Sequence, residues 1–176
     1  MKRNHYVVET LLYPFQAELL EMPACAFFLR GEWAPCLSSG DWKSVLRVEQ
    51  TLKQEADDWV ARGFEVLSDL DGTYPVGMCL LTKHKKENYG NIARAWDALE
   101  DGGVLVCVGS NDIGAKSIEK NIRKVWPLEG GEAKNHCRVF WLRKTGEVEI
   151  PDEWRSYTEL AQNIKGETFY TQPGVY

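Results

Sequence analysis

The sequence predicts an α/β fold with a mostly parallel, twisted sheet and helices on both faces. Short apolar runs alternate with amphipathic stretches through the middle of the chain, as expected where helices connect parallel strands. One run, Val76–Leu81, is nearly all apolar, which is typical of a strand buried on both faces. The length of 176 residues fits one ordinary domain with or without a small appendage.

The composition is that of a globular protein. Hydrophobic residues make up 44% of the chain and charged residues 27%, far from the composition of disordered proteins. The 21 Lys and Arg residues against 26 Asp and Glu residues give a formal net charge of −5. This balance argues against a dedicated nucleic-acid coat but is compatible with a local basic patch. No membrane span, collagen-like repeat or disulfide-dense scaffold is indicated.

The cysteines and histidines predict neither a disulfide frame nor a metal site. The five cysteines are Cys25, Cys36, Cys79, Cys107 and Cys137. None of them forms a C-x-x-C pair, and none of the three histidines has a zinc-like spacing to a cysteine pair. Scattered cysteines in apolar runs indicate buried thiols in a reducing compartment. Charged residues also interrupt the apolar stretch before Ala24-Cys25-Ala26, so a secretory signal is not predicted and a cytoplasmic location is expected.

Ala24–Leu29 is predicted as the first strand of the sheet. A helix is predicted to follow from Asp41 to Ala61, because apolar residues recur there at steps of three and four. These residues are Val45, Val48, Leu52, Ala56 and Trp59. Asp41 is suited to cap the start of this helix, and Gly63 to end it in a left-handed conformation.

Two further strands, Phe64–Leu67 and Val76–Leu81, precede a second helix at Glu87–Leu99. Tyr89, Ile92, Trp96 and Leu99 share one side of that helix. Gly102-Gly103 is expected to break it, and Val104–Val108 is predicted as a central strand.

The third predicted helix, Ala115–Trp126, is stopped by Pro127. Cys137–Leu142 is predicted as a strand, and Lys144–Glu147 is interpreted as a turn into a short antiparallel partner before Pro151. Thr168–Thr171 is predicted as one more strand, and Trp154 and Tyr157 are expected to pack on the domain.

The segment Gly109–Ser117, between a strand and a helix, is nearly a phosphate-binding P-loop. In a true P-loop the lysine directly follows the second glycine, whereas here Ala115 intervenes between Gly114 and Lys116. The insertion rotates the lysine by about 100° around the helix. A tight strand–helix turn, in which the glycines allow close backbone approach, is therefore favoured over a nucleoside triphosphate site. The amides at the helix start, with Lys116, still suit a phosphate.

The run Lys83-His84-Lys85-Lys86 directly follows the third predicted strand. Ligands of open parallel sheets bind outside the carboxyl ends of the strands. If Val76–Leu81 and Val104–Val108 are neighbours, this run and the Gly109–Ser117 loop share one crevice. An ordinary solvated loop is the alternative, and it is preferred. The candidates for RNA or phosphate binding are Lys83, Lys85, Lys86, Asn111 and Lys116.

A dinucleotide or adenosyl cofactor needs a glycine-rich turn after the first strand. The residues after Leu29 are Arg30-Gly31-Glu32-Trp33, a single glycine among bulky side chains, so this turn is not expected to hold a cofactor. Neither a Gly-x-Ser-x-Gly elbow nor a clear nucleophile–base pair is present in the sequence. No catalytic residue is therefore assigned.

Several of these segments, in this order, resemble one family: the N-terminal half of the bacterial small-subunit rRNA guanine-N2 methyltransferases. The similar segments are Leu81–Glu87, Leu99–Gly103, Gly109–Ser117, Lys134–Trp141 and Thr168–Tyr176, and Leu11–Phe15 resembles an α-proteobacterial branch. The Thr-x-Pro-Gly-Val ending is the most specific part. In that family two Rossmann-like methyltransferase domains stand in tandem, and the C-terminal one binds S-adenosylmethionine and carries an Asn-Pro-Pro-aromatic motif.

This chain lacks that motif, since the corresponding strand end is Thr82-Lys83-His84-Lys85. The resemblance thus implies the degenerate partner domain, which supports the catalytic half and helps recognise small-subunit rRNA. S-adenosylmethionine is the expected cofactor of the parent protein, with no cofactor in this chain, which alone is expected to be inactive. The implied division is an N-terminal extension over residues 1–23, a methyltransferase-like domain over 24–150, and a linker and first strand over 151–176 that lead to a catalytic domain. Two alternatives remain: a self-sufficient small methyltransferase, and a phosphate- or nucleotide-binding protein using Gly109–Ser117.

Overall fold

Seven strands form one twisted sheet in the computed structural model, which describes residues 2–158, 160–164 and 167–171. The strands run in the order β3-β2-β1-β4-β5-β7-β6. Their bounds are β1 Ala26–Leu29, β2 Leu46–Glu49, β3 Glu65–Leu67, β4 Tyr74–Leu80, β5 Leu99–Ser110, β6 Gly130–Lys134 and β7 Cys137–Arg143. The pairs from β3 to β5 are parallel, whereas β7 is antiparallel to both β5 and β6. The predicted α/β class, with an antiparallel strand near one edge, is confirmed.

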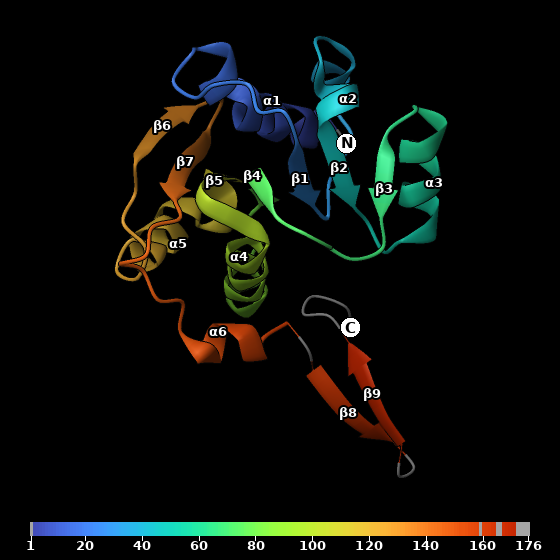
Figure 1. The fold of residues 1–176 in the computed structure, drawn as a ribbon, viewed down its shortest axis with the longest axis vertical. Helices are drawn as coiled ribbons and strands as arrows, with labels where there is room; N and C mark the ends of the chain where they lie inside the picture. The colour runs from blue at the N-terminus through green and yellow to red at the C-terminus, as the bar shows by residue number, and fades with distance from the viewer. Residues whose placement is uncertain (1, 159, 165–166, 172–176) are drawn as a thin grey trace.

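Helices cover both faces of this sheet (Figure 1). They are α1 Lys2–Gln16, α2 Trp42–Val45, α3 Lys53–Ala61, α4 Lys85–Ala98, α5 Ala115–Ile122 and α6 Asp152–Ser156, with 3-10 turns η1 at Pro35–Ser38 and η2 at Asn111–Ile113. A separate antiparallel pair joins β8 Leu160–Ile164 to β9 Glu167–Thr171, the region where one more strand is predicted.

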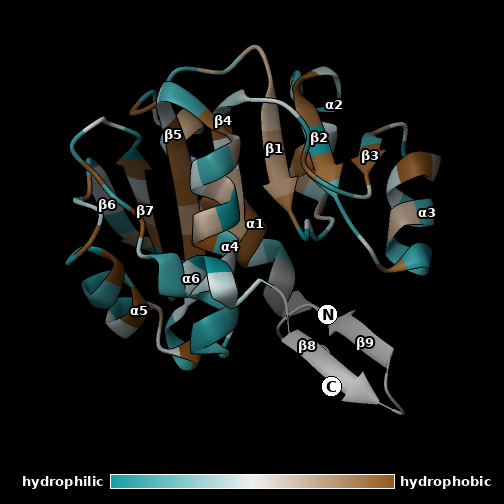
Figure 2. Cartoon of the chain, turned by 60° about the horizontal axis from the view of Figure 1, so that its bottom comes forward, coloured by the Kyte–Doolittle hydropathy of each residue, from teal (hydrophilic) through white to brown (hydrophobic). Residues whose placement is uncertain are grey.

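Alternating side chains of the strands feed two separate cores. Phe28 of β1 packs with Leu11 of α1 and Trp59 of α3 in one core, while Phe27 packs with Ile92 of α4 and other residues of α4, α5 and α6 in the second. This division follows from the two-residue repeat of a strand, which sends neighbouring side chains to opposite faces. Figure 2 shows β4 and β5 largely brown, whereas α4, α5 and α6 carry teal surfaces.

The predicted helix from Asp41 to Ala61 is wrong. The structure divides this segment into α2, the strand β2 and α3, and Asp41 makes no side-chain cap at the start of α2. Residues Leu46–Glu49 pair in parallel with Ala26–Leu29 of β1 and, on the other side, with β3. Hydrogen bonds to strands on both sides stabilise this segment as a strand. The spacing of the apolar residues is compatible with both a continuous helix and a helix–strand–helix arrangement, so it does not distinguish them. Gly63 does adopt the predicted left-handed conformation, with φ of +85°.

The predicted antiparallel partner after Lys144–Glu147 is also wrong. Residues 147–150 form no strand, and the partner of β7 is instead β6, which precedes it in the chain. The connecting turn places Asn135 and His136 at positive φ, 53° and 57°. This conformation suits the twist of a two-residue hairpin but is uncommon without glycine, so the apolar pattern alone does not indicate it. The helix predicted to Trp126 ends at Ile122, and residues 123–125 continue as turns.

Trp154 of α6 fixes the end of the domain on α4. Its ring stacks on that of Tyr89 with centroids 4.6 Å apart and planes 7° apart. Gly90 of α4 allows the residues after α6 to approach closely, because a Cβ there would lie 3.2 Å from backbone atoms of Tyr157 and Thr158. The expected packing of Trp154 is therefore observed.

Gly77, in the centre of the sheet, provides a test of this packing. A Cβ at this position would lie 2.6 and 2.8 Å from the Cε atoms of Phe27, whose ring is fully buried. We expect Gly77→Ala to lower the free energy of unfolding by about 1–3 kcal/mol, measured by urea denaturation. Gly146→Ala is the matched control, since a Cβ there meets nothing within 4 Å. Equal stability of the two variants would contradict the packing described for Phe27.

Candidate functional site

The reversal of strand order between β1 and β4 creates the candidate site. From β1 the chain continues to β2 and β3 on one side, then crosses to β4 on the other. Ligands of open α/β sheets bind outside the carboxyl ends of the strands at such a point. A cavity of about 290 Å³ lies there, hereafter the switch-point crevice. It is lined by Arg30, Glu32, Gln50, Leu52, Glu55, Leu80, Thr82, Lys83, His84, Glu87 and Asn91.

A fully buried carboxylate, Glu49, stands at the end of β2 beside this crevice. Arg94 of α4 donates from Nη2 to Glu49 Oε1 at 2.9 Å, and the backbone N–H of Arg30 donates to Oε2 at 3.0 Å. In dinucleotide-binding folds an acidic residue about 20 positions after the first turn binds a ribose hydroxyl. Glu49 occupies the corresponding place, but both of its oxygens are already bonded within the chain.

A second ion pair crosses the crevice between Arg30, after β1, and Glu87 of α4. Only 4% of the Glu87 side chain is exposed. Its Oε2 also accepts a hydrogen bond from Thr82 Oγ1 at 2.8 Å. The arginine side chain therefore lies in the space between β1 and α4, and it is held there by a buried partner.

The strand end at Thr82 is bonded to the first turns of α4. Thr82 N–H donates to Asn88 Oδ1 at 2.8 Å, and Asn88 Nδ2 donates back to the Thr82 carbonyl at 2.7 Å. The N–H of His84 donates to Thr82 Oγ1 at 3.2 Å. These bonds use the polar groups that could otherwise face a substrate at the end of β4.

The turn after β1 is packed onto the core at Gly31. Its carbonyl accepts hydrogen bonds from Trp59 Nε1 at 3.0 Å and from Gln50 Nε2 at 3.3 Å. A Cβ at this glycine would lie 2.7 Å from a ring carbon of Phe28 and 2.8 Å from Val48. The single glycine of this turn therefore allows the close approach of the turn to the sheet.

The five sequence-predicted RNA or phosphate residues fall into two places. Lys83 lines the switch-point crevice, and Lys85 and Lys86 begin α4 with their ammonium groups 5.7 and 5.4 Å from the ring centroids of Tyr89 and Tyr157. Asn111 and Lys116 instead line a different cavity beside α5. Strands β4 and β5 are neighbours as the sequence argument requires, but the two groups do not line one cavity.

The loop resembling a P-loop forms a compact turn. Two of its amides are bonded to carbonyls: Asn111 N–H to His136 at 2.9 Å and Gly114 N–H to Asn111 at 3.1 Å. A Cβ at Gly109 would lie 3.0 Å from the Cβ atoms of both Leu81 and Ala115, so this glycine allows the helix to approach the strand. A P-loop holds phosphates with open amides, and the tight turn is the better description here.

Metal and thiol chemistry find no support in the described part of the chain. No three His, Cys, Asp or Glu side chains gather there as a metal ion would require. All five cysteines are free thiols. Burial raises the pKa of Cys36 to about 11, and burial beside Cys79 raises the pKa of Cys107 well above its usual value. Neither thiol is an activated nucleophile at neutral pH, because the thiolate is the reactive form.

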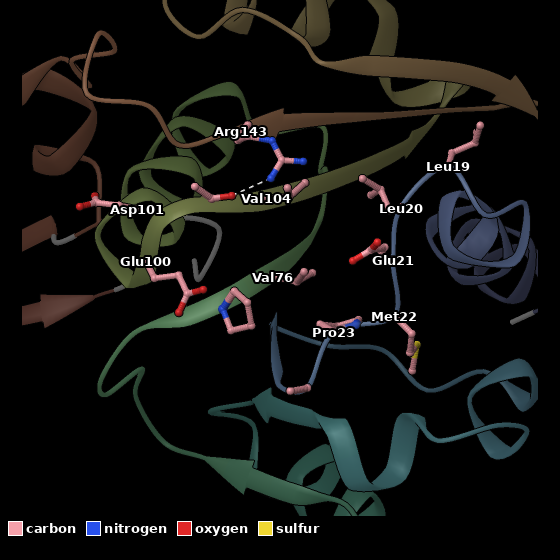
Figure 3. Close-up of a pocket in the computed structure, with 13 residues that line it drawn as sticks. Leu19, Leu20, Glu21, Met22, Pro23, Val76, Glu100, Asp101, Val104 and Arg143 are labelled. Carbon is pink, nitrogen blue, oxygen red and sulfur yellow. Dashed lines mark hydrogen bonds between the residues drawn. The ribbon is translucent and has the colours of Figure 1, made fainter.

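A hollow of about 570 Å³ lies at the opposite edge of the sheet, where the parallel strands begin (Figure 3). Residues 19–24 form one wall of it, with Glu100, Asp101 and Arg143 among the residues on the other side. Arg143 donates to the carbonyl of Gly102 at 2.7 Å and binds Glu129 through two hydrogen bonds of 2.6 and 2.9 Å. The arginine therefore ties the ends of β5, β6 and β7 together, and this edge is not where α/β sheets bind ligands.

The sequence missed Glu49 and Arg94 as site residues. Glu49 lies in the segment predicted as a continuous helix, so its position at a strand end was hidden. The spacing of 20 residues from Leu29 to Glu49 is the signal that could have found it.

No protein-family model and no curated protein matches the sequence significantly. Among solved structures, a T. thermophilus 16S rRNA N2-methyltransferase in complex with AdoMet and guanosine matches with a TM-score of 0.66 and 19% identity, over 97% of this chain and 47% of that one. A putative methyltransferase from Pseudomonas syringae matches with a TM-score of 0.58 and 12% identity, over 78% and 97%. A ribosomal protein L11 methylase from Lactobacillus delbrueckii subsp. bulgaricus matches with a TM-score of 0.56 and 8% identity, over 78% and 79%.

This chain thus spans about half the length of the rRNA methyltransferase. Likeness at these identities concerns the fold. Within the described residues, no helix combines the length and apolar character that a membrane crossing requires. The chain has the Rossmann-like fold of S-adenosylmethionine-dependent methyltransferases.

Proposed function

We propose that this chain is a non-catalytic, methyltransferase-like domain that supports a catalytic methyltransferase domain and helps it recognise small-subunit rRNA. The observation that carries the proposal is the switch-point crevice, which the ion pair Arg30–Glu87 crosses and beside which Arg94 holds the buried carboxylate of Glu49. The rRNA methyltransferase of similar fold matches over nearly the whole of this chain but only 47% of its own length. That coverage supports a second domain as the partner. In this proposal residues 1–23 are an extension, 24–150 the methyltransferase-like domain, and 151–176 the connection to the catalytic domain.

The residues of the crevice do not fit S-adenosylmethionine. A ribose hydroxyl would need an accessible carboxylate, whereas Glu49 is fully buried and turned toward Arg94 and the backbone N–H of Arg30. The cavity of about 290 Å³ is also at the lower end of the roughly 300–1,000 Å³ usual for ligand pockets. A ligand that displaced the Arg30 guanidinium would break its ion pair with the buried carboxylate of Glu87, and leaving such a charge without its partner costs about 3–5 kcal/mol.

Neither alternative function gains an observation in its favour. A self-sufficient methyltransferase needs a site for S-adenosylmethionine, and the residues of the switch-point crevice do not fit that cofactor. A nucleotide-binding protein needs open amides in the loop Gly109–Ser117, where Asn111 and Gly114 already donate to backbone carbonyls. Contact of RNA with the lysines at the crevice and beside α5, among them Lys83 and Lys116, remains a proposal.

A methyl-transfer assay tests the proposed function. The purified chain is incubated with radiolabelled S-adenosylmethionine and small-subunit rRNA, alone and with a separately produced catalytic domain of the same protein family. We expect no incorporation of label by this chain alone, and incorporation by the catalytic domain that rises when this chain is added. Label transferred to RNA by this chain alone would overturn the proposal.

A further inference from the structure

A basic groove lies between α5 and the hairpin of β6 and β7, hereafter the α5 groove. Its volume is about 590 Å³. It is lined by Asn111, Lys116, Glu119, Lys120, Arg123, Ala133 and Arg138. Four of these seven residues are cations, in a protein whose formal net charge is −5. Of these residues the sequence argument named only Asn111 and Lys116, and Arg138 of β7 joins the cations of α5 only in the fold.

Three of the cations form a row along α5. Lys116, Lys120 and Arg123 are spaced by four and three residues, which places them on one face of a helix. The row extends about 10 Å at 1.5 Å per residue. One strand of a nucleic-acid duplex carries a charge about every 3.4 Å of its axis, so the row is long enough to meet several successive phosphates.

The fourth cation, Arg138 of β7, is fixed by a buried carboxylate. Only 5% of the Glu119 side chain is exposed, and it accepts hydrogen bonds from Arg138 Nε at 2.5 Å and Nη2 at 3.1 Å. Arg123 Nη2 binds the same carboxylate at 2.9 Å. A Cβ at Gly131 would lie 3.1 Å from Arg138 Nη2, so the glycine leaves room for the guanidinium over β6. Both guanidinium groups are therefore held in place before any ligand arrives.

The lining favours phosphate over a protein partner. Protein interfaces are rich in aromatic anchors and poor in lysine at their centre, whereas the α5 groove contains no aromatic residue and two exposed lysines. Guanidinium forks held by a carboxylate still present further N–H groups, and these suit phosphate oxygens. The absence of a ring from the lining also leaves no platform on which single-stranded bases could stack.

We propose that the α5 groove binds the sugar–phosphate backbone of base-paired RNA, without reading its sequence. This inference rests on the proposed function for the class of ligand, since a role beside an rRNA methyltransferase domain brings the chain to structured RNA. Contacts to phosphates position a protein on a duplex and carry no sequence information. The groove would thus orient the catalytic domain on rRNA while that domain selects the base.

The test measures binding of the full chain to a fluorescent RNA hairpin by anisotropy across a series of salt concentrations. In Lys116→Ala/Lys120→Ala we expect weaker binding, and a slope of log affinity against log salt reduced by about two. Both lysines are exposed and make no contact that the core needs. Lys43→Ala/Lys53→Ala removes the same charge from α2 and α3 and is expected to bind as the unaltered chain does. Unpaired RNA of equal length and magnesium nucleoside triphosphate are expected to compete only weakly.

The other outcomes of this binding experiment overturn the RNA-binding role of the groove or the identity of its ligand. Unchanged salt slope and affinity in Lys116→Ala/Lys120→Ala overturn the proposal that the α5 groove binds RNA. The proposed function of the chain still stands in that case if the chain binds the hairpin. An equal or larger loss in Lys83→Ala/Lys85→Ala also overturns the groove and places the contact at the switch-point crevice. Preferred binding of unpaired RNA or of the nucleotide overturns the duplex ligand. No salt-dependent binding by the unaltered chain overturns both the groove and the RNA role of the proposed function.

Discussion

Replacing Arg94 with leucine is expected to lower the free energy of unfolding by about 3–5 kcal/mol. The variant leaves the carboxylate of Glu49, fully buried at the end of β2, without its cation. The carboxylate keeps the hydrogen bond from the backbone N–H of Arg30. A lone buried charge is far more costly than a missing surface interaction, because no solvent replaces the lost partner. Urea denaturation at neutral pH measures the effect.

Arg47→Leu is the matched control for this result. Arg47 of β2 pairs with Glu65 of β3, but more than half of the Glu65 side chain is exposed. Loss of a surface pair is expected to cost less than about 1 kcal/mol. The double variant Glu49→Leu/Arg94→Leu should recover part of the loss, since it removes the buried charge together with its partner. Equal effects of Arg94→Leu and Arg47→Leu would show that the buried pair contributes no more to the free energy of unfolding than a surface pair.

Trp59→Ala is the second large expected effect, at about 3–5 kcal/mol. The indole of this α3 residue is 1% exposed. Its ring centroid lies 5.0 Å from that of Phe64 and 5.6 Å from that of Trp33, in edge-to-face geometry. Its Nε1 also donates to the carbonyl of Gly31. The substitution therefore leaves a cavity and removes one hydrogen bond that holds the turn after β1 on the core.

The neighbouring residue supplies the comparison, because Val60 on the same helix is 59% exposed. Val60→Ala is expected to change the free energy of unfolding by no more than about 0.5 kcal/mol. Urea denaturation of both variants with circular dichroism as the probe gives the two values. A loss in Trp59→Ala no greater than that in Val60→Ala would mean that the aromatic cluster does not anchor this turn.

Much of the sheet could be predicted from the sequence, because buried strands leave a local signal. Val104–Val108 is an uninterrupted apolar run, and it lies within the central strand β5. The four residues of β2 carry no such signal, since Val48 also fits the helical repeat of Val45, Leu52, Ala56 and Trp59. Only pairing with β1 and β3 decides between the two, and that pairing is not visible in local sequence.

The residues of the candidate site could likewise be predicted only in part from the local sequence. The glycine-poor turn after β1 was visible in the sequence, and the structure gives it a packing role at Gly31. The ion pairs at and beside the crevice join residues far apart in the chain, such as Glu49 with Arg94. Spacing along the sequence cannot indicate such a pair, because the sheet order brings β2 and α4 together. The cation Arg138 was likewise hidden within a predicted strand.

Calorimetric titration of the chain with S-adenosylmethionine measures whether the switch-point crevice binds this cofactor. We expect no saturable heat, because the ion pair Arg30–Glu87 crosses the crevice where the cofactor would lie and the carboxylate of Glu49 is buried against Arg94. A catalytic methyltransferase of the same fold, titrated under identical conditions, confirms that the ligand and instrument report binding. Saturable, micromolar binding of S-adenosylmethionine by this chain would contradict the account.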